Sequence, residues 1–194
     1  MLNVSQLSCE RDHRLLFENL SFVVGEGEVL LVEGGNGAGK TTLLRILCGL
    51  YTEFNGLVDW QLSQSPVYVG HKPGVKDLLS ARENLAWLTS LHQISVTAAQ
   101  ITEALRQVGL RGFEEVPCGA MSEGQRKRVN LARLYLLDSQ AWVLDEPFSA
   151  IDVAGIASLE ARIDMHLGSG GLLILTSHLP LTLSRSVKTL RLGQ

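Results

Sequence analysis

Residues 34–42 read GGNGAGKTT and lie between the apolar run Val29–Val32 and the helix-like segment Leu43–Leu47. This stretch fits the G-x-x-x-x-G-K-[ST] phosphate loop, and a strand before it with a helix after it is the context that gives such a match weight. Glycines let the backbone turn tightly so that its N–H groups point at phosphate oxygens, and the helix adds the positive end of its dipole. The alternative is a glycine-rich turn that holds no ligand. If the stretch is a phosphate loop, we expect it to bind a nucleotide through Gly34, Gly35, Asn36, Gly37, Ala38, Gly39, Lys40, Thr41 and Thr42.

Lys40 and Thr41 carry the charge chemistry of this loop. A lysine at this position can reach the β- and γ-phosphates as a point charge, and the threonine hydroxyl can ligate Mg²⁺. We therefore expect Lys40 to be a phosphate contact and Thr41 a metal ligand.

An acidic pair follows the short buried strand expected at Trp142–Leu144. Parallel sheets present ligands at the carboxyl ends of their strands, where Asp145 and Glu146 stand. We expect Asp145 to hold Mg²⁺ through water and Glu146 to polarise the attacking water. Neighbouring acidic residues after a strand are otherwise a helix cap or a turn pair.

Residues 121–125 read MSEGQ and lead into a segment with helical spacing, for which we expect a helix from Arg126 to Leu137. A serine and a glycine at a helix start form an anion site as well as a cap. The basic cluster Arg126-Lys127-Arg128 is interpreted as a solvated helix face.

The order of these motifs resembles that of an ATP-binding-cassette ATPase over nearly the whole chain. M-S-E-G-Q is similar to the family signature L-S-G-G-Q, with Met121 for Leu and Glu123 for Gly, and F-S-A-I-D at residues 148–152 is similar to the D-loop. The resemblance implies ATP and Mg²⁺ as ligands and a γ-phosphate contact from His178, which alone would be a capped or core histidine. It also implies that Ser122, Glu123, Gly124 and Gln125 act on a partner's ATP and that Asp152 belongs to the D-loop.

Two positions depart from the family pattern. His71 stands where the family usually has a metal-contacting glutamine; a neutral imidazole can accept from a metal-bound water, whereas a protonated one opposes the ion. Arg11 stands near the aromatic that commonly stacks on adenine. A guanidinium can lie flat on a base, but it can equally pair on the surface with Asp12 or Glu10.

The fold expected from these motifs is α/β: a phosphate-loop ATPase domain with a mixed or parallel sheet core, an antiparallel β subdomain and a helical lobe that carries the signature. We expect one domain over residues 1–194, with the lobe inserted at about 73–124. The expected strands are Leu2–Ser8, Leu15–Val24, Gly56–Trp60, Val67–Val69, Leu172–Leu175 and Val187–Leu192, and the further helices are Leu78–Leu91, Ala98–Val108 and Ile156–Leu167.

The composition of the chain excludes some classes of function and indicates a location. A net charge of −3 and a pI near 5.9 argue against a general nucleic-acid binder. The start of the chain lacks a basic, apolar secretion signal, and its three cysteines have no C-x-x-C spacing, so we expect a reducing, cytoplasmic location.

The spacing of the motifs predicts a homodimer. About 13 helical residues, on the order of 20 Å of helix axis, separate Ser122 from the strand that leads to Asp145, so the signature is not expected to reach its own phosphate loop. Two copies packed head to tail would place Ser122 and Gly124 of one chain at the ATP held by Lys40 of the other.

Within the family, four segments are similar to the ATPase subunit of the cytochrome c maturation haem export system. They read CERDHRLLF at 9–17, EGGNGAGKTTLLR at 33–45, GHKPGVK at 70–76 and DEPFSAID at 145–152. This resemblance implies integral membrane permease subunits as partners, on the cytoplasmic face of the bacterial inner membrane, with no direct haem ligand in this chain. The alternatives are the ATPase subunit of another exporter and a soluble assembly ATPase of the iron–sulfur kind.

Overall fold

The computed structural model describes residues 1–193, and the chain divides into two compact units. The first unit comprises Met1–Tyr68, Ser139–Glu146 and the chain from Ile163 onward. The second comprises Val69–Asp138 and Pro147–Arg162, and it includes the whole of the lobe expected at 73–124.

The larger sheet of the first unit has five strands. Its order is β5 (Val67–Val69), β6 (Ala141–Asp145), β7 (Leu172–Thr176), β3 (Val29–Glu33) and β8 (Val187–Arg191). The pairs β6–β7, β7–β3 and β3–β8 are parallel, and β6 and β7 are buried along their whole length, as strands of a covered parallel sheet are. The ends of β3, β6 and β7 therefore meet at one edge of the sheet.

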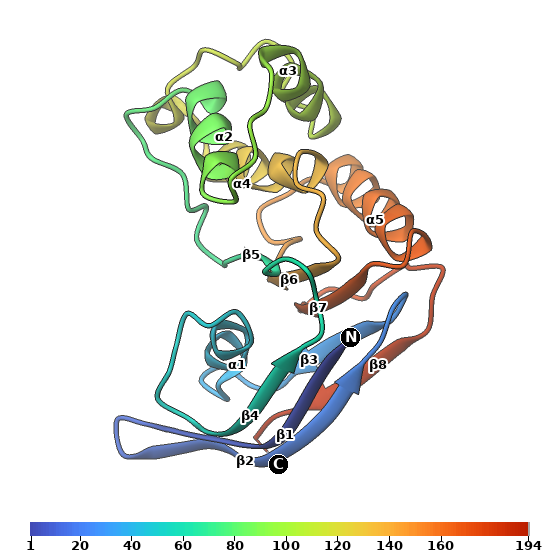
Figure 1. Ribbon diagram of the computed structural model, residues 1–194. Helices are drawn as coiled ribbons and strands as arrows, with labels where there is room; N and C mark the ends of the chain where they lie inside the picture. The colour runs from blue at the N-terminus through green and yellow to red at the C-terminus, as the bar shows by residue number, and fades with distance from the viewer. Residues whose placement is uncertain (194) are drawn as a thin grey trace. The chain divides into compact units, whose positions relative to one another are not determined.

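A three-stranded antiparallel sheet belongs to the same unit. Its order is β2 (Arg14–Val24), β1 (Leu2–Arg11) and β4 (Asn55–Trp60). Strands β1 and β2 form a hairpin that runs out past helix α1 (Lys40–Leu47), as the dark blue ribbon in Figure 1 shows. Asp12 and His13 make its turn with φ of 51° and 60°, the left-handed values that two-residue hairpins require.

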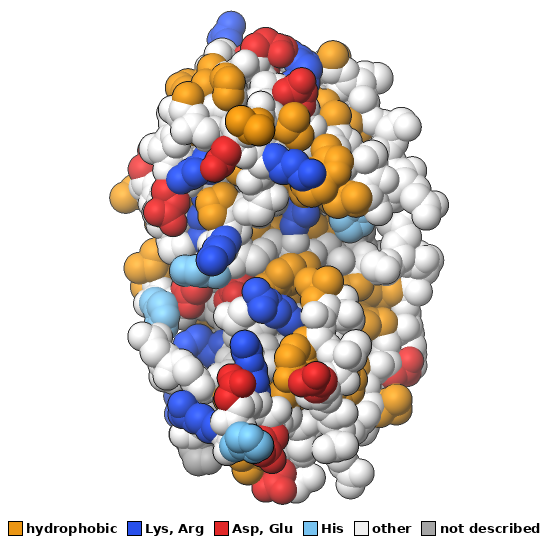
Figure 2. All heavy atoms as spheres, turned by 90° about the vertical axis from the view of Figure 1, so that its left-hand side faces the viewer, with side chains coloured by type: hydrophobic (Ala, Val, Ile, Leu, Met, Phe, Trp, Pro, Cys, Tyr) orange, Lys and Arg blue, Asp and Glu red, His pale blue; other side chains and the backbone are white. Residues whose placement is uncertain are grey.

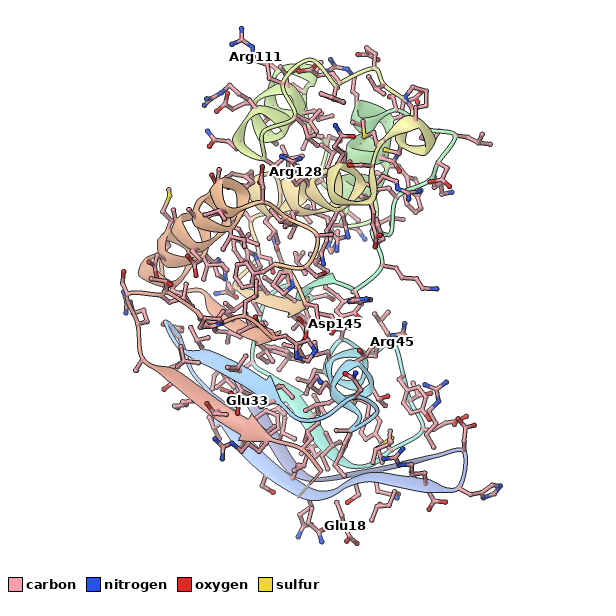
Figure 3. All side chains as sticks on the ribbon, turned by 180° about the vertical axis from the view of Figure 1, so that it is seen from behind. Glu18, Glu33, Arg45, Arg111, Arg128 and Asp145 are labelled. Carbon is pink, nitrogen blue, oxygen red and sulfur yellow. The ribbon has the colours of Figure 1, made fainter. Side chains whose placement is uncertain are left out.

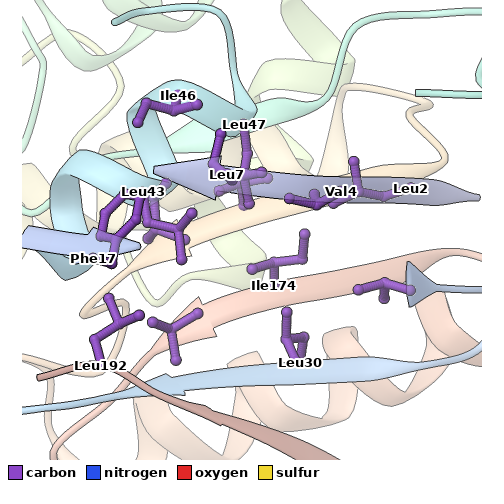
Figure 4. Close-up of a cluster of buried hydrophobic side chains, with 14 of the residues drawn as sticks. Leu2, Val4, Leu7, Phe17, Leu30, Leu43, Ile46, Leu47, Ile174 and Leu192 are labelled. Carbon is purple, nitrogen blue, oxygen red and sulfur yellow. The ribbon is translucent and has the colours of Figure 1, made fainter. Parts of the chain in front are cut away.

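The core of the first unit holds helix α1 in place. Leu43, Leu44, Ile46 and Leu47 of α1 are buried among side chains from both sheets (Figure 4). Burying one such side chain contributes about 1.5–3 kcal/mol. Because α1 begins directly after the phosphate loop, this packing fixes one end of the loop and β3 fixes the other. The neighbouring side chains include Leu2, Val4, Leu7, Phe17, Leu30, Ile174 and Leu192.

The second unit is helical. It contains α2 (Ala81–Ser90), α3 (Ala98–Gln107), α4 (Glu123–Ala132) and the first part of α5 (Val153–Gly168), with 3₁₀ turns at Cys118–Ala120 and Arg133–Tyr135. Helices α2, α3 and α4 share a buried apolar cluster.

Several helix boundaries differ from the expected ones, and side-chain capping explains where helices α2 and α4 begin. Helix α2 begins at Ala81 and not at Leu78, because Ser80 and Glu83 form a reciprocal capping box. Helix α4 begins at Glu123 and not at Arg126, because Ser122 and Gln125 do the same. It ends at Ala132, where the chain tightens into the 3₁₀ turn. Helix α5 is longer than expected at both ends.

Within residues 1–193, the helices are too short or too polar to cross a lipid bilayer.

Candidate functional site

The phosphate loop requires glycine at particular positions. Gly34, Gly37 and Gly39 have φ of 151°, 78° and 95°, which side-chain-bearing residues rarely adopt. A Cβ on Gly34 would lie 2.8 Å from the carbonyl oxygen of Leu192, and one on Gly39 would lie 3.0 Å from the Cβ of Leu16. Gly35 has open space around it and no such φ, so only three of the four glycines are needed for the loop's shape.

The start of α1 leaves its backbone N–H groups available to a ligand. Gly39 occupies the N-cap position in the left-handed conformation and has no side chain with which to cap the helix. The first-turn N–H groups and the positive end of the helix dipole form an anion site there. The Lys40 ammonium donates to the carbonyl oxygens of Gly34, at 2.6 Å, and Gly35, at 3.3 Å, so the lysine already lies across the loop.

Asp145 connects the phosphate loop to the neighbouring strands. The Thr41 hydroxyl donates to its Oδ2 at 2.8 Å, and the Thr176 hydroxyl donates to its Oδ1 at 2.8 Å. The carboxylate is 2% exposed, and these two donors satisfy both of its oxygens. Asp145 and Thr176 pair directly in the β6–β7 register, which explains why they meet. Oxygen donors of this kind suit Mg²⁺, which keeps several waters and takes few protein ligands.

Tyr68 and Arg45 lie near this carboxylate, and Figure 3 shows Arg45 and Asp145 beside α1. Burial raises the pKa of the Tyr68 phenol, the negative charge of Asp145 raises it further, and a hydrogen bond with Arg45 opposes the change. Tyr68 is therefore a neutral phenol at physiological pH.

Glu146 and His178 face each other at the ends of β6 and β7. The backbone N–H of His178 donates to Glu146 Oε2 at 3.2 Å, and His178 Nε2 lies 3.4 Å from Glu146 Oε1. Glu146 has a φ of 51°, and its backbone N–H donates to the Thr176 hydroxyl at 2.9 Å. This strained conformation at a strand end is typical of active-site residues. The glutamate side chain is 14% exposed and the histidine side chain 65% exposed, so the imidazole is open to a ligand from outside.

Arg11 takes the surface pairing that the sequence left open. Its Nε lies 3.5 Å from Asp12 Oδ2, and both side chains are exposed. An exposed pair of this kind is worth about 0–1 kcal/mol and can be given up, so stacking of Arg11 on adenine stays a prediction.

The signature residues form the start of α4 in the second unit. The Ser122 hydroxyl accepts from the backbone N–H of Gln125 at 3.2 Å, and the Gln125 side chain accepts from the backbone N–H of Ser122 at 2.9 Å. Glu123 and Gly124 occupy the first two helical positions. A Cβ on Gly124 would overlap the carbonyl oxygen of Ala150 in the D-loop segment, so no larger residue fits without a shift of one backbone.

Lys127 ties the signature helix to the D-loop segment, and here the solvated-face interpretation was wrong. The side chain is 2% exposed, and its ammonium donates to the Ser149 hydroxyl. Ala150 has a φ of 59°, and Asp152 Oδ1 accepts from the backbone N–H of Gly155 at 3.1 Å at the start of α5. Asp152 thus ends the loop as a helix cap, which leaves its expected D-loop role untested.

His71 is exposed and belongs to the second unit, whereas Asp145 and Thr41 belong to the first. Its expected metal contact therefore stays a prediction. The other residues of the expected metal and catalytic set, Thr41, Asp145, Glu146 and His178, all belong to the first unit. Sequence reasoning missed the role of Thr176; the signal that the sequence offered was a hydroxyl directly after the expected strand Leu172–Leu175.

Comparisons with known proteins agree with this arrangement. Residues 17–149 match the family model described as ABC transporter. The cytochrome c biogenesis ATP-binding export protein CcmA of Pseudomonas putida is 47% identical over 100% of this chain and 97% of its own length. The protein of the same name from Salmonella typhi is 49% identical over 93% of this chain and 91% of its own length.

Solved structures share the fold. An ABC transporter ATP-binding protein from Pyrococcus furiosus superposes with a TM-score of 0.84 at 25% identity, covering 98% of this chain and 96% of that one. A dimeric ATP-binding cassette bound to ADP and Pi superposes with a TM-score of 0.80 at 20% identity, covering 92% and 88%. The expected α/β architecture is thereby confirmed.

Proposed function

The chain belongs to the ABC transporter family of ATPases, and on that premise we propose that it is the ATP-hydrolysing subunit of a complex that exports or delivers haem for c-type cytochrome biogenesis. The observation that carries this proposal is its full-length similarity to cytochrome c biogenesis ATP-binding export proteins. The geometry of the first unit supports the ATPase part, because the phosphate loop, Asp145, Glu146 and His178 meet at one edge of the sheet.

ATP binding is assigned to the phosphate loop and the start of α1. The uncapped N–H groups hold phosphate oxygens, and Lys40 exchanges the carbonyl oxygens of Gly34 and Gly35 for the β- and γ-phosphates. Thr41 and Asp145 would hold Mg²⁺, which neutralises phosphate charge when it is bound. The two residues fit this role because their oxygens already lie 2.8 Å apart.

Hydrolysis is assigned to Glu146 and His178. The Glu146 carboxylate orients or deprotonates the attacking water, and the exposed His178 imidazole contacts the γ-phosphate. Their present contact holds each near the other, and Thr176 fixes the backbone of Glu146.

A second copy of the chain is proposed to complete each ATP site. The start of α4 offers a helix N-terminus, which is an anion site, and it comprises Ser122, Glu123, Gly124 and Gln125. The distance along the chain between this site and Asp145 favours contact with the nucleotide of a partner chain. Asp152 and its loop would lie at the same interface, because Lys127 of the signature helix contacts Ser149 of that loop.

Mixing two inactive variants tests the shared sites. Lys40→Ala removes the phosphate contact, and Ser122→Arg blocks the signature, so each homodimer should lack activity. A mixed dimer keeps up to one intact composite site, and we expect partial ATPase activity to return. Complete failure to complement, with mixed dimers shown to form by differential tagging, would mean that the sites are not assembled from two chains.

The proposed partners outside the dimer are integral membrane permease subunits of the cytochrome c maturation system. The chain would then act as a peripheral protein on the cytoplasmic face of the bacterial inner membrane. We expect no nucleic-acid partner: the net charge is −3, and lysine and arginine side chains alternate with acidic and hydrophobic ones on the face that Figure 2 draws. We expect no haem ligand in this chain.

Purification in mild detergent separates this proposal from its alternatives. The tagged full-length chain, recovered from solubilised membranes of its native cell, should bring down integral membrane proteins in stoichiometric amounts. Deletion of the genes for those proteins should abolish covalent haem attachment to cytochromes. Recovery only from the soluble fraction would favour an assembly ATPase of the iron–sulfur kind, and membrane partners without effect on cytochromes would favour another exporter.

A further inference from the structure

Two arginines stand opposite each other at the tip of the β1–β2 hairpin. Arg11 ends β1, Arg14 begins β2, and the two are direct partners in the antiparallel register. Like charges directly opposite each other destabilise such a pair. Asp12 offsets only one of them, because its carboxylate lies 3.5 Å from Arg11.

Arg14 extends toward the phosphate loop. A Cβ built on Gly37 would lie 3.6 Å from Arg14 Nη1, so the guanidinium is beside the middle glycine of the loop. Within the described residues 1–193, no acidic side chain pairs with Arg14, and the residue is exposed. Two cations therefore lie against the loop: Lys40 at Gly34 and Gly35, and Arg14 at Gly37.

We propose that Arg14 is a nucleotide-binding residue that contacts the polyphosphate of the bound nucleotide. The inference rests on the proposed ATPase function. A guanidinium offers several N–H donors in a planar fork and matches phosphate oxygens better than an ammonium does. The guanidinium lies beside Gly37, which belongs to the loop whose N–H groups hold phosphate. Arg14 is therefore expected to contact the phosphates and not the base. Bound phosphate also relieves the repulsion between Arg14 and Arg11.

Binding measurements with ligands of different phosphate number test this assignment. Calorimetric titration of the full-length chain with ATP, ADP and AMP should show that Arg14→Gln weakens ATP binding about tenfold, since a hydrogen bond to a charged group is lost. AMP binding should change less than about twofold. Lys188→Gln is the matched control, because it removes one positive charge from an exposed ion pair with Glu28 in the same unit and should leave all three affinities unchanged. Arg14→Lys should recover part of the loss, and the ATP affinity of Arg14→Gln should depend less steeply on salt.

Two results would overturn the assignment. One is ATP affinity of Arg14→Gln within about twofold of the unmodified chain, with unchanged thermal unfolding of both proteins. The other is an equal loss for AMP and ATP, which would mean a contact with the base, the ribose or the α-phosphate that the two ligands share, and not with the β- and γ-phosphates. On the prediction that Arg11 stacks on adenine, Arg11→Gln should weaken the binding of ATP, ADP and AMP alike and so gives the pattern of a base contact for comparison.

The Lys40→Ala variant, beside the unmodified chain, distinguishes a failure of the Arg14 proposal from a failure of the proposed ATPase function. Loss of ATP binding in Lys40→Ala with no effect of Arg14→Gln refutes only the role of Arg14. Absence of ATP binding by the unmodified chain would refute the proposed function itself.

Discussion

Replacing Glu146 with Gln is expected to preserve ATP binding and to lower ATP turnover by at least about a hundredfold, the usual range for loss of a general base or water-positioning group. The amide keeps the shape of the side chain and can still lie beside His178, whose Nε2 is 3.4 Å from Glu146 Oε1. It cannot accept a proton from water, so the loss should fall on turnover. The measurement is steady-state phosphate release beside ATP affinity by titration.

Glu18→Gln provides the matched control. Glu18 is exposed on β2 and lies far from Asp145 in Figure 3, so removing its carboxylate should leave turnover unchanged. Near-normal turnover in Glu146→Gln would remove Glu146 from the catalytic role and leave Asp145 and His178 as the groups to examine. A loss of ATP binding in that variant would instead show that Glu146 supports the site's structure.

The elements that place the first unit's site were predictable because short-range rules fix them. A strand, a glycine turn and a helix in sequence determine the phosphate loop, and acidic residues at the end of a buried strand determine Asp145 and Glu146. Parallel pairing then brings the ends of β3, β6 and β7 together without further information. In the structure the Thr41 hydroxyl donates to Asp145, and His178 lies beside Glu146.

Contacts made by long side chains were not predictable in the same way. Lys127 reads as one member of a solvated basic cluster, yet it is buried, and its ammonium donates to the hydroxyl of Ser149, which is distant in the sequence. Arg11 and Arg14 are equally charged and three positions apart, and only the hairpin turn decides that Arg14 extends to Gly37. Which group a charged side chain contacts depends on tertiary packing. The spacing of residues in a single sequence does not indicate such contacts.

The prediction that reaches furthest concerns the cell. Replacing Lys40 with Ala in the native organism is expected to abolish covalent c-type haem while b-type haem proteins remain. Lys40 lies across the phosphate loop, at 2.6 Å from the carbonyl oxygen of Gly34, and supports only the ATP-driven step. Haem synthesis and non-covalent haem insertion do not pass through that step, so b-type cytochromes should be spared.

Haem staining of denatured membrane proteins measures the outcome, because only thioether-linked haem survives denaturation, and a spectrum of b-type cytochromes from the same membranes is the internal reference. Lys188→Gln, which removes a lysine from the same unit but from a strand outside the loop, should give normal staining of both classes. Normal c-type staining in Lys40→Ala would refute the haem role and leave the ATPase subunit of another exporter. Loss of both classes would point to general haem supply, because a defect confined to covalent attachment has no means of depleting haem that binds without a thioether bond.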